Sequence, residues 1–400
     1  MKDKKGIIFL IVASIISTII GIVLLIVFVN HSGQVSVNDE VYTPPLEKNK
    51  FIPEKYESFE QEKEEKKEKR TISITAVGDI LLGRGVGGRI ERQNLGYQYP
   101  FAEIEKFMAS DIVFGNLEEP ITDSTHSFCN VNEGGKYILK NSPESIEAIQ
   151  CAHFNVFSLA NNHILDFYDE GLNDTLNILD ENNIYHAGAG ENLTTARKPA
   201  IIEKDGFKTA VFAYTDMAEI VYKGNPQINF LATDSRYGVA PREMEYILED
   251  IEKVKNEADL VIVSFHWGVE DSFSVQKEQR EFAYKLMDNG VDIILGHHPH
   301  RFQGIEIYKG KPIIYSMGNL IFDQNDEENQ EGFIVKMQYQ EQKLIDFYLI
   351  PFRVIGKTQV VPVYGKDSSA LLERQKKLSN ELNTQCEIKK GRIYYINKEA

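Results

Sequence analysis

The chain has 400 residues with a formal net charge of −16, and 42% of its residues are hydrophobic. That apolar content can bury a sizeable core, whereas the acidic balance argues against nucleic-acid binding, because such binding depends on Lys and Arg contacts to phosphates. We therefore expect a folded protein with no nucleic acid among its partners.

The first element along the chain is an apolar run at residues 6–29. It is about 24 residues long and has no ionised side chain, and a helix of that length rises roughly 36 Å, enough to cross a bilayer. Three lysines precede it and no Lys or Arg follows before Lys48, so we predict that residues 1–5 are cytoplasmic and that the rest of the chain is extracellular. A cleavable signal peptide is the alternative, but its apolar region would be only about 7–15 residues long. We expect a single-pass anchor in the cell membrane.

Residues 30–70 have the composition of a stalk. Pro44 and Pro45 are followed by a dense run of charged residues, in which Glu and Lys recur four positions apart with no apolar stripe. This pattern is typical of a solvated helix or an extended spacer. We predict a linker that holds the following domain away from the membrane. A segment that binds the cell wall or a partner is the alternative.

Residues 71–355 alternate between short apolar β-branched runs and amphipathic stretches. The apolar runs are typical of strands buried on both faces, and the amphipathic stretches are typical of helices that cover a sheet. We predict strands at residues 71–77, 112–114, 156–159, 209–214, 260–265, 291–295 and 312–316. We predict helices at residues 142–152, 170–182, 241–256 and 276–289. Such alternation indicates a layered α/β domain.

The C-terminal part departs from this alternation. Residues 332–340 and 343–350 are predicted to form a hairpin across a polar turn. Residues 356–400 are predicted to form a small irregular or helical extension.

The three cysteines are too few and too scattered for a metal cluster or a disulfide framework. An odd number of cysteines outside the cell leaves at least one thiol free or paired between chains. A bridge between Cys129 and Cys151 is compatible with the sequence, but the sequence does not establish it.

Unusual polar residues follow most of the predicted strands, just past their carboxyl ends. In open α/β sheets, binding sites lie outside the carboxyl ends of the strands, so these residues are expected to converge. Six such clusters occur: Gly78-Asp79, Gly115-Asn116-Leu117-Glu118, Asn161-Asn162-His163 with Asp166, His266-Trp267-Gly268, Gly296-His297-His298-Pro299-His300, and Gly318-Asn319. They predict one shared site at the sheet edge.

The residue types in these clusters favour a metal site. Imidazole, carboxylate and amide groups together suit Zn, Mn or Fe(II) rather than a thiolate site or an all-oxygen calcium site. Two such ions about 3.5–4 Å apart would activate water and bind a phosphoryl or acyl oxygen. We predict one or two divalent ions, with ligands drawn from Asp79, Glu118, Asn162, His266, His297, His298 and His300.

Simpler explanations remain for several of these residues. Asp79, Glu118 and the Asn-rich loop before His163 each fit a turn without any ligand. Trp267, the single Trp, is expected to pack or to stack on a substrate rather than to catalyse. Arg84 either binds an anionic group or lies on the surface. The histidines outside the clusters are expected to be structural.

The ordered set of six motifs, with Arg84 after the first, resembles the CapA/PgsA family of poly-γ-glutamate capsule proteins. The resemblance covers roughly residues 71–355, and an N-terminal anchor with an outward domain is similar to the membrane-attached members of that family. It implies a fold similar to calcineurin-like metallophosphoesterases, in which helices flank a sandwich of two mixed sheets. It also implies a role in the assembly or export of an anionic polymer, with membrane-embedded synthase and export proteins as partners.

The resemblance implies roles for individual residues as well. Asp79 would be the metal ligand after the first strand, Glu118 the bridging carboxylate and Asn162 a metal-binding amide. His163 would be the catalytic residue, oriented by Asp166. His266 and the pair His298 and His300, or His297 and His300, would complete the two metal sites. We also predict that the substrate is contacted by Arg84, Asn116, Trp267 and Asn319.

The sequence departs from the phosphoesterase pattern at two positions. Ile80 and Leu81 follow Asp79 where the pattern has Asp-x-His, and Glu118 stands where the pattern has a bridging Asp. One of two metal sites therefore lacks an expected ligand. Three functions stay compatible with the sequence: a polymer assembly or export factor, an extracellular metallohydrolase acting on a phosphoester or amide, and a non-catalytic scaffold.

Overall fold

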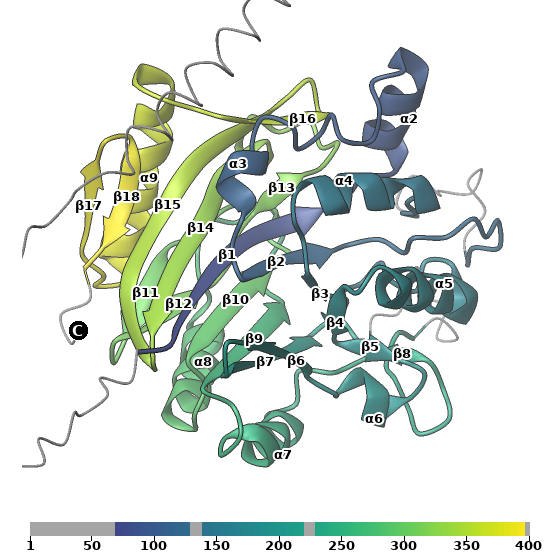
Figure 1. The fold of residues 1–400 in the computed structure, drawn as a ribbon, viewed down its shortest axis with the longest axis horizontal. Helices are drawn as coiled ribbons and strands as arrows, with labels where there is room; N and C mark the ends of the chain where they lie inside the picture. Colours follow the sequence, from purple (N-terminus) through teal and green to yellow (C-terminus); the bar gives the residue numbers. More distant parts are fainter. Residues whose placement is uncertain (1–68, 129–137, 220–228, 397–400) are drawn as a thin grey trace, which may run out of the picture. The chain divides into compact units, whose positions relative to one another are not determined.

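The computed structural model describes residues 69–128, 138–219 and 229–396 (Figure 1). The predicted anchor at residues 6–29 and almost all of the predicted stalk lie outside these residues. Among the described helices, none is long and apolar enough to span a bilayer.

The larger sheet is mixed and is organised around β1. On one side of β1, the strands β2, β3 and β4 run parallel to it, while β14 and β15 on the other side form an antiparallel hairpin. Its strands are β1 (Thr71–Ile80), β2 (Ile112–Leu117), β3 (Val156–Ser158), β4 (Tyr185–Ala187), β13 (Asn319–Ile321), β14 (Glu331–Gln340), β15 (Lys343–Ile355), β16 (Gln359–Pro362), β17 (Cys386–Lys389) and β18 (Arg392–Tyr395).

The smaller sheet has a parallel centre with an antiparallel strand at each edge. Its strands, in spatial order, are β11 (Ile305–Tyr308), β12 (Lys311–Ile314), β10 (Ile293–His297), β9 (Leu260–His266), β7 (Phe207–Thr215) and β6 (Ala200–Lys204). The central strands β9 and β10 are buried along their whole length, as their continuous apolar runs predict. A separate two-stranded ladder joins β5 (Ala189–Gly190) and β8 (Gly238–Val239).

Three apolar cores define the layers. One core lies between the two sheets and includes residues such as Phe114 from the larger sheet and Ile262 from the smaller one. A second covers the outer face of the larger sheet, and a third covers the outer face of the smaller sheet. The helices are α2 (Arg84–Gln93), α3 (Glu105–Met108), α4 (Ile146–Cys151), α5 (Tyr168–Glu181), α6 (Leu193–Ala196), α7 (Met244–Val254), α8 (Lys277–Asp288) and α9 (Lys366–Glu381), with short 3-10 turns at Pro143–Ser145 and Glu327–Asn329.

Helices α2, α3, α4 and α5 supply buried residues to the second core, and α7 and α8 supply them to the third. The molecule is therefore a helix–sheet–sheet–helix sandwich, and the expected mixed α/β fold is confirmed. The predicted hairpin at residues 332–350 is present as β14 and β15.

Residues 356–400 differ from the expected irregular or helical extension. Their described part contains α9, but it also contains a hairpin of β17 and β18, and β18 pairs with β15 of the larger sheet. In Figure 1 these elements lie together in yellow along the edge of that sheet. Leu371 and Leu372 of α9 join the core between the sheets. The tail thus completes the sandwich, because its apolar residues cover a strand that would otherwise be an open edge.

Cys151 and Cys386 form no disulfide with one another or with any other described residue. Cys129 lies outside the described residues, so the Cys129–Cys151 pairing stays a prediction.

Candidate functional site

The two sheets bring four polar residues together at the carboxyl ends of their strands. Asp79 of β1 stands opposite Asn116 of β2, and His266 at the end of β9 stands opposite His297 at the end of β10. The two pairs meet across the sandwich, where His297 Nδ1 lies 3.1 Å from Asp79 Oδ1. All four are fully buried, so the convergence predicted from the strand ends is found in the structure.

Asp79 is the centre of this cluster. Its Oδ1 also accepts a hydrogen bond from Asn116 Nδ2 at 2.9 Å, and its Oδ2 accepts one from the backbone N–H of His298 at 3.2 Å. His300 Nδ1 lies 3.5 Å from Oδ2. Burial alone would raise the pKa of Asp79, but the hydrogen bond and charge of His297 and the charge of His300 outweigh it and hold this pKa below its ordinary value.

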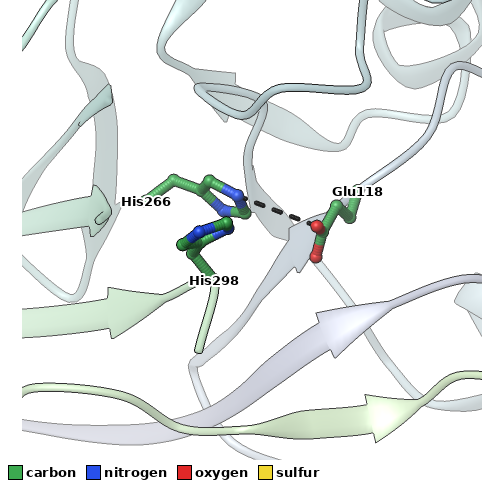
Figure 2. Close-up of side chains that lie close together, drawn as sticks. All are labelled: Glu118, His266 and His298. Carbon is green, nitrogen blue, oxygen red and sulfur yellow. Dashed lines mark ion pairs between the residues drawn. The ribbon is translucent and has the colours of Figure 1, made fainter. Parts of the chain in front are cut away.

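Two groups of three residues bring their nitrogen and oxygen atoms close enough to hold a metal ion. The first is Glu118, His266 and His298, and the second is Asp79, Glu118 and His300, with the candidate ligand atoms of each group within 4.8 Å of one another. Figure 2 shows the first group, in which both imidazole rings lie beside the Glu118 carboxylate, and His266 Nε2 is 3.7 Å from Glu118 Oε1. Glu118 belongs to both groups, as the bridging role implied by the resemblance requires.

Three buried atoms of this cluster have no hydrogen-bond partner among the described residues: Glu118 Oε1, His297 Nε2 and His298 Nδ1. A buried polar atom without a partner costs about 1–3 kcal/mol, so several together in one place need an explanation. An imidazole nitrogen and a carboxylate oxygen are both donors to Zn, Mn or Fe(II). The residues therefore fit a divalent cation.

The charge balance supports the same conclusion. Burial, and then the charge of Asp79, raise the pKa of Glu118 well above its ordinary value. Burial and the charges of the neighbouring histidines lower the pKa of His266 well below its ordinary value and that of His298 to about 3. His266 and His298 are thus held neutral, which is the form that binds metals, and a cation would stabilise the ionised form of Glu118.

His298 and His300 have unusual backbones. Their φ angles are 94° and 57°, in the left-handed region that residues other than glycine seldom adopt. Such backbone conformations cost of order 1–3 kcal/mol each and cluster at functional sites. The Gly-His-His-Pro-His turn therefore holds its imidazoles in place at the expense of local stability.

A close approach between β1 and β13 fixes the opposite side of the cluster. A Cβ atom on Gly78 would lie 1.8 Å from the carbonyl oxygen of Gly318, and Gly318 itself has a φ of 61°. Asp79 N–H donates to the same carbonyl oxygen at 2.8 Å. Only glycine at position 78 allows this approach, which places Asp79 beside the His297–His300 turn.

The predicted catalytic pair is also formed. His163 Nδ1 lies 2.9 Å from Asp166 Oδ2, and the backbone N–H of Leu139 donates to the same oxygen at 2.6 Å. Burial raises the pKa of Asp166, although the charge of His163 opposes this effect. The preceding Asn162 reaches the cluster directly, with its Oδ1 2.8 Å from His266 Nε2. The loop after β3 therefore connects the dyad to the candidate metal ligands.

Four predicted substrate contacts have different surroundings. Asn116 and Asn319 are fully buried; Asn116 donates to Asp79, while Asn319 Oδ1 lies 2.8 Å from His300 Nδ1. Both positions favour a role in orienting the candidate metal ligands rather than in contacting the substrate. Trp267 is also fully buried, stacks on Phe265 and donates to the carbonyl oxygen of Tyr315 at 2.9 Å, which favours packing over substrate stacking. Arg84 is partly exposed and pairs with Asp323.

Sequence reasoning missed the polar residues behind Asn319. Its Nδ2 donates to Gln324 Oε1 at 2.9 Å and to the carbonyl oxygen of Asn329 at 3.0 Å. It also missed Glu119, whose buried carboxylate accepts hydrogen bonds from the N–H groups of Leu82 and Gly83. Burial raises the pKa of Glu119 to about 8. The partners of Glu119 are distant in the sequence, and the contacts of Asn319 with Gln324 and Asn329 lie in an irregular segment that no local pattern marks.

The fold and the site together define a mixed α/β protein with a buried cluster of histidines and carboxylates that fits a divalent cation. The chain belongs to the family of bacterial capsule synthesis proteins named PGA_cap, whose model matches residues 73–324. That range contains every residue of the cluster.

The relatives agree with this assignment. The chain is 32% identical to the PGA biosynthesis protein CapA of Bacillus subtilis over 81% of this chain and 82% of that protein. It is 30% identical to the capsule biosynthesis protein CapA of Bacillus anthracis, over 71% of this chain and 67% of that protein. Among solved structures, the calcineurin-like phosphoesterase YfkN of Bacillus subtilis matches with a TM-score of 0.43 and 13% identity, over 79% of this chain and 99% of that one.

Proposed function

We propose that this chain is an accessory factor in the synthesis of a poly-γ-glutamate capsule, and that it assembles or exports the polymer at the outer face of the cell membrane. The family match and the names of the two CapA relatives support the capsule role. A relative from Mycobacterium tuberculosis, 29% identical over 70% of this chain, is named a probable polyglutamine synthesis accessory protein. The apolar run at residues 6–29 and the lysines before it support the anchor.

The observation that carries a role for the cluster is the set of unpartnered buried atoms on Glu118, His297 and His298. A divalent cation there would be held by Glu118, His266 and His298, or by Asp79, Glu118 and His300. Such a cation supplies a Lewis acid and binds an anionic oxygen of the substrate. The side chains would hold the reacting group in place, and Asp166 would fix the ring of His163 so that its free nitrogen exchanges a proton with the substrate.

The first test is made in cells. Deletion of the gene is expected to reduce the amount or the length of the surface polymer, and the full-length chain is expected to restore both. A chain with His298→Ala and His300→Ala is expected to reach the membrane at the normal level without restoring the polymer. Unchanged polymer after deletion would exclude the capsule role. Full rescue by the double variant would favour the scaffold alternative, in which the cluster has no chemical task.

An extracellular hydrolase is the second candidate function, and the His163–Asp166 pair beside the cluster favours it. The purified full-length chain, supplied with Mn or Zn, would then cleave phosphoester substrates or shorten the polymer. His163→Ala is expected to lower that turnover about 100- to 10,000-fold while leaving the metal content unchanged. Turnover that survives this substitution would remove His163 from the mechanism.

A further inference from the structure

The turn that begins α2 already holds a carboxylate. The guanidinium of Arg84 donates to both oxygens of Asp323, with Nε 3.0 Å from Oδ2 and Nη2 bonded to Oδ1. The backbone N–H of Gly85 donates to the same Oδ2 at 3.0 Å. One carboxylate thus receives three hydrogen bonds, two of them in the parallel fork that makes arginine selective for carboxylates.

The Arg84 guanidinium and the Gly85 N–H, which together we call the receptor, are held in place by several features of the fold. Arg84 has a φ of 46°, a left-handed backbone that is costly for a residue with a side chain. A Cβ atom on Gly85 would lie 2.6 Å from Asp323 Oδ2, so a larger residue at position 85 would push the carboxylate away from its present place on this N–H. The Arg84 guanidinium also lies over the ring of Phe322, 5.7 Å from its centre. These features set the position of the guanidinium.

The receptor is next to the candidate metal cluster. The ring of Phe322, which lies under Arg84, has its centre 4.8 Å from that of His300. A ligand carboxylate on Arg84 would therefore place the rest of its chain close to His300.

The carboxylate now in the receptor belongs to the segment between β13 and β14. Gln324, the next residue, accepts from Asn319, which in turn holds His300. Further along, Asp326 pairs with Arg301 at the protein surface. Phe322 fixes the start of this segment in the second core, whereas Asp323 and the residues after it are attached through polar contacts, which a competing polar ligand can replace.

We propose that Arg84 and the Gly85 N–H form a carboxylate subsite for the anionic polymer, and that Asp323 is an internal competitor which occupies it until a polymer carboxylate displaces it. The inference rests on the proposed function, because it names how the same site recognises its polymer. The receptor can bind only one carboxylate at a time. The apparent affinity for the polymer is therefore the intrinsic affinity multiplied by the fraction of molecules in which Asp323 does not occupy Arg84.

The alternative is a structural role, which we call the clamp: the ion pair between Asp323 and Arg84 only holds α2 against the segment between β13 and β14. The two models predict opposite effects for removal of Asp323. Competition predicts tighter polymer binding, whereas a clamp predicts weaker or unchanged binding because the receptor loses its shape.

The experiment measures binding of poly-γ-glutamate of defined length to the full-length chain at fixed salt, beside Arg84→Ala, Asp323→Ala and the double variant. Asp323→Ala is expected to bind about 5- to 10-fold more tightly, and Arg84→Ala at least about 10-fold more weakly. The double variant is expected to bind like Arg84→Ala. Without the Arg84 guanidinium, Asp323 and the polymer no longer share a binding group, so removal of Asp323 has no further effect. Thermal unfolding of each variant checks that the fold is retained.

Two controls distinguish competition for Arg84 from the general effect of removing a negative charge from the segment. Asp326→Ala removes an equal charge from the same segment and is expected to change affinity less than about 2-fold. Monomeric glutamate is expected to compete with the polymer at Arg84 if a single carboxylate suffices, whereas no competition indicates that the subsite needs neighbouring units of the chain.

The outcomes distinguish the two levels of proposal. If no form of the chain binds the polymer, the polymer-binding role and this inference both fail. If the unaltered chain binds but Arg84→Ala binds equally well, only the subsite is overturned. Equal or weaker binding by Asp323→Ala overturns the competition and leaves the clamp.

Discussion

Glu118 and Glu306 are both buried carboxylates, but their surroundings are opposite. Glu306 of β11 accepts hydrogen bonds from Arg280 Nε and Nη2 at 3.2 and 2.8 Å, from Tyr284 OH at 2.5 Å and from Tyr315 OH at 2.8 Å. Glu118 is approached by the Asn116 amide at 3.4 Å on Oε2, and its Oε1 has no hydrogen-bond partner among the described residues.

The difference separates a carboxylate whose partners all come from the fold from one whose surroundings fit a cation. A buried charge with a full set of partners is part of the fold, and removing one partner leaves the others unpaired. A buried carboxylate with an open oxygen, beside neutral imidazoles, is destabilising until a cation reaches it. Each of the following predictions tests one side of this contrast.

The largest effect is expected for Glu118→Gln. Because Glu118 is shared by both groups of candidate ligands, this change is expected to lower the affinity for Zn or Mn by more than about 100-fold, beyond the usual loss for residues that only support a ligand. Elemental analysis of the full-length chain and competition with a chelator measure the affinity. The metal-free variant is expected to be at least as stable as the unaltered chain, since it lacks a carboxyl group whose ionised form is unfavourable in this buried position.

The matched control is Glu306→Gln, which makes the same chemical change at the satisfied carboxylate. It is expected to retain the metal. Equal metal loss in both variants would show that the contrast between the two carboxylates has no functional meaning.

Glu306→Ala is expected to reduce the free energy of unfolding by about 3–5 kcal/mol. The reason is that the guanidinium of Arg280 and two tyrosine hydroxyls lose their common acceptor. Urea unfolding of the metal-free protein measures this loss. A decrease below about 1 kcal/mol would mean that solvent replaces the carboxylate, and Glu306 would then not be a structural charge.

The strand-end rule predicted which side chains meet, and the structure shows why it worked. Asp79, His266 and His297 each follow a continuous apolar run, and such runs become parallel strands whose carboxyl ends share one edge. The glycines beside them indicated tight backbone geometry, as Gly78 shows. The type and order of the central elements were therefore readable from local patterns.

Contacts made by irregular segments could not be predicted in this way. Arg84 pairs with Asp323, which is distant in the sequence, and Gln324 supports Asn319 from within the irregular segment that follows β13. The role of residues 356–400 was missed for a related reason. Whether β18 becomes an edge hairpin or part of a sheet depends on the exposed edge of β15, which only the folded structure supplies.

A smaller effect is expected for Asn319→Ala. Asn319 orients the ring of His300 through a contact of 2.8 Å, and loss of such support lowers metal affinity by about 10- to 100-fold. The same chelator competition measures it. Asn289→Ala is the control, because Asn289 lies at the end of α8 and its amide caps that helix through the carbonyl oxygen of Lys285. If both variants keep full affinity, His300 does not depend on Asn319.

Lys336 of β14 is a second charged group with a full set of hydrogen-bond partners. Its ammonium lies 2.7 Å from Thr75 Oγ1, 2.9 Å from Ser110 Oγ, 3.0 Å from the carbonyl oxygen of Phe107 and 3.1 Å from that of Ala109. Burial, and to a smaller extent the charge of Arg392, lower the pKa of Lys336 to about 8.

The smallest effect is therefore a dependence of stability on alkaline pH. Between pH 8 and the ordinary lysine pKa of 10.5, the unfolded chain keeps a proton that folded Lys336 has released, so the free energy of unfolding rises with pH. After allowance for solvent screening of a half-buried group, the rise is about 1 kcal/mol. Urea unfolding of the unaltered chain and of Lys336→Met across this range measures it. A variant with the same slope would assign the pH dependence to other groups, whereas a flat profile in the variant alone would show that even a fully partnered buried charge retains a cost of burial.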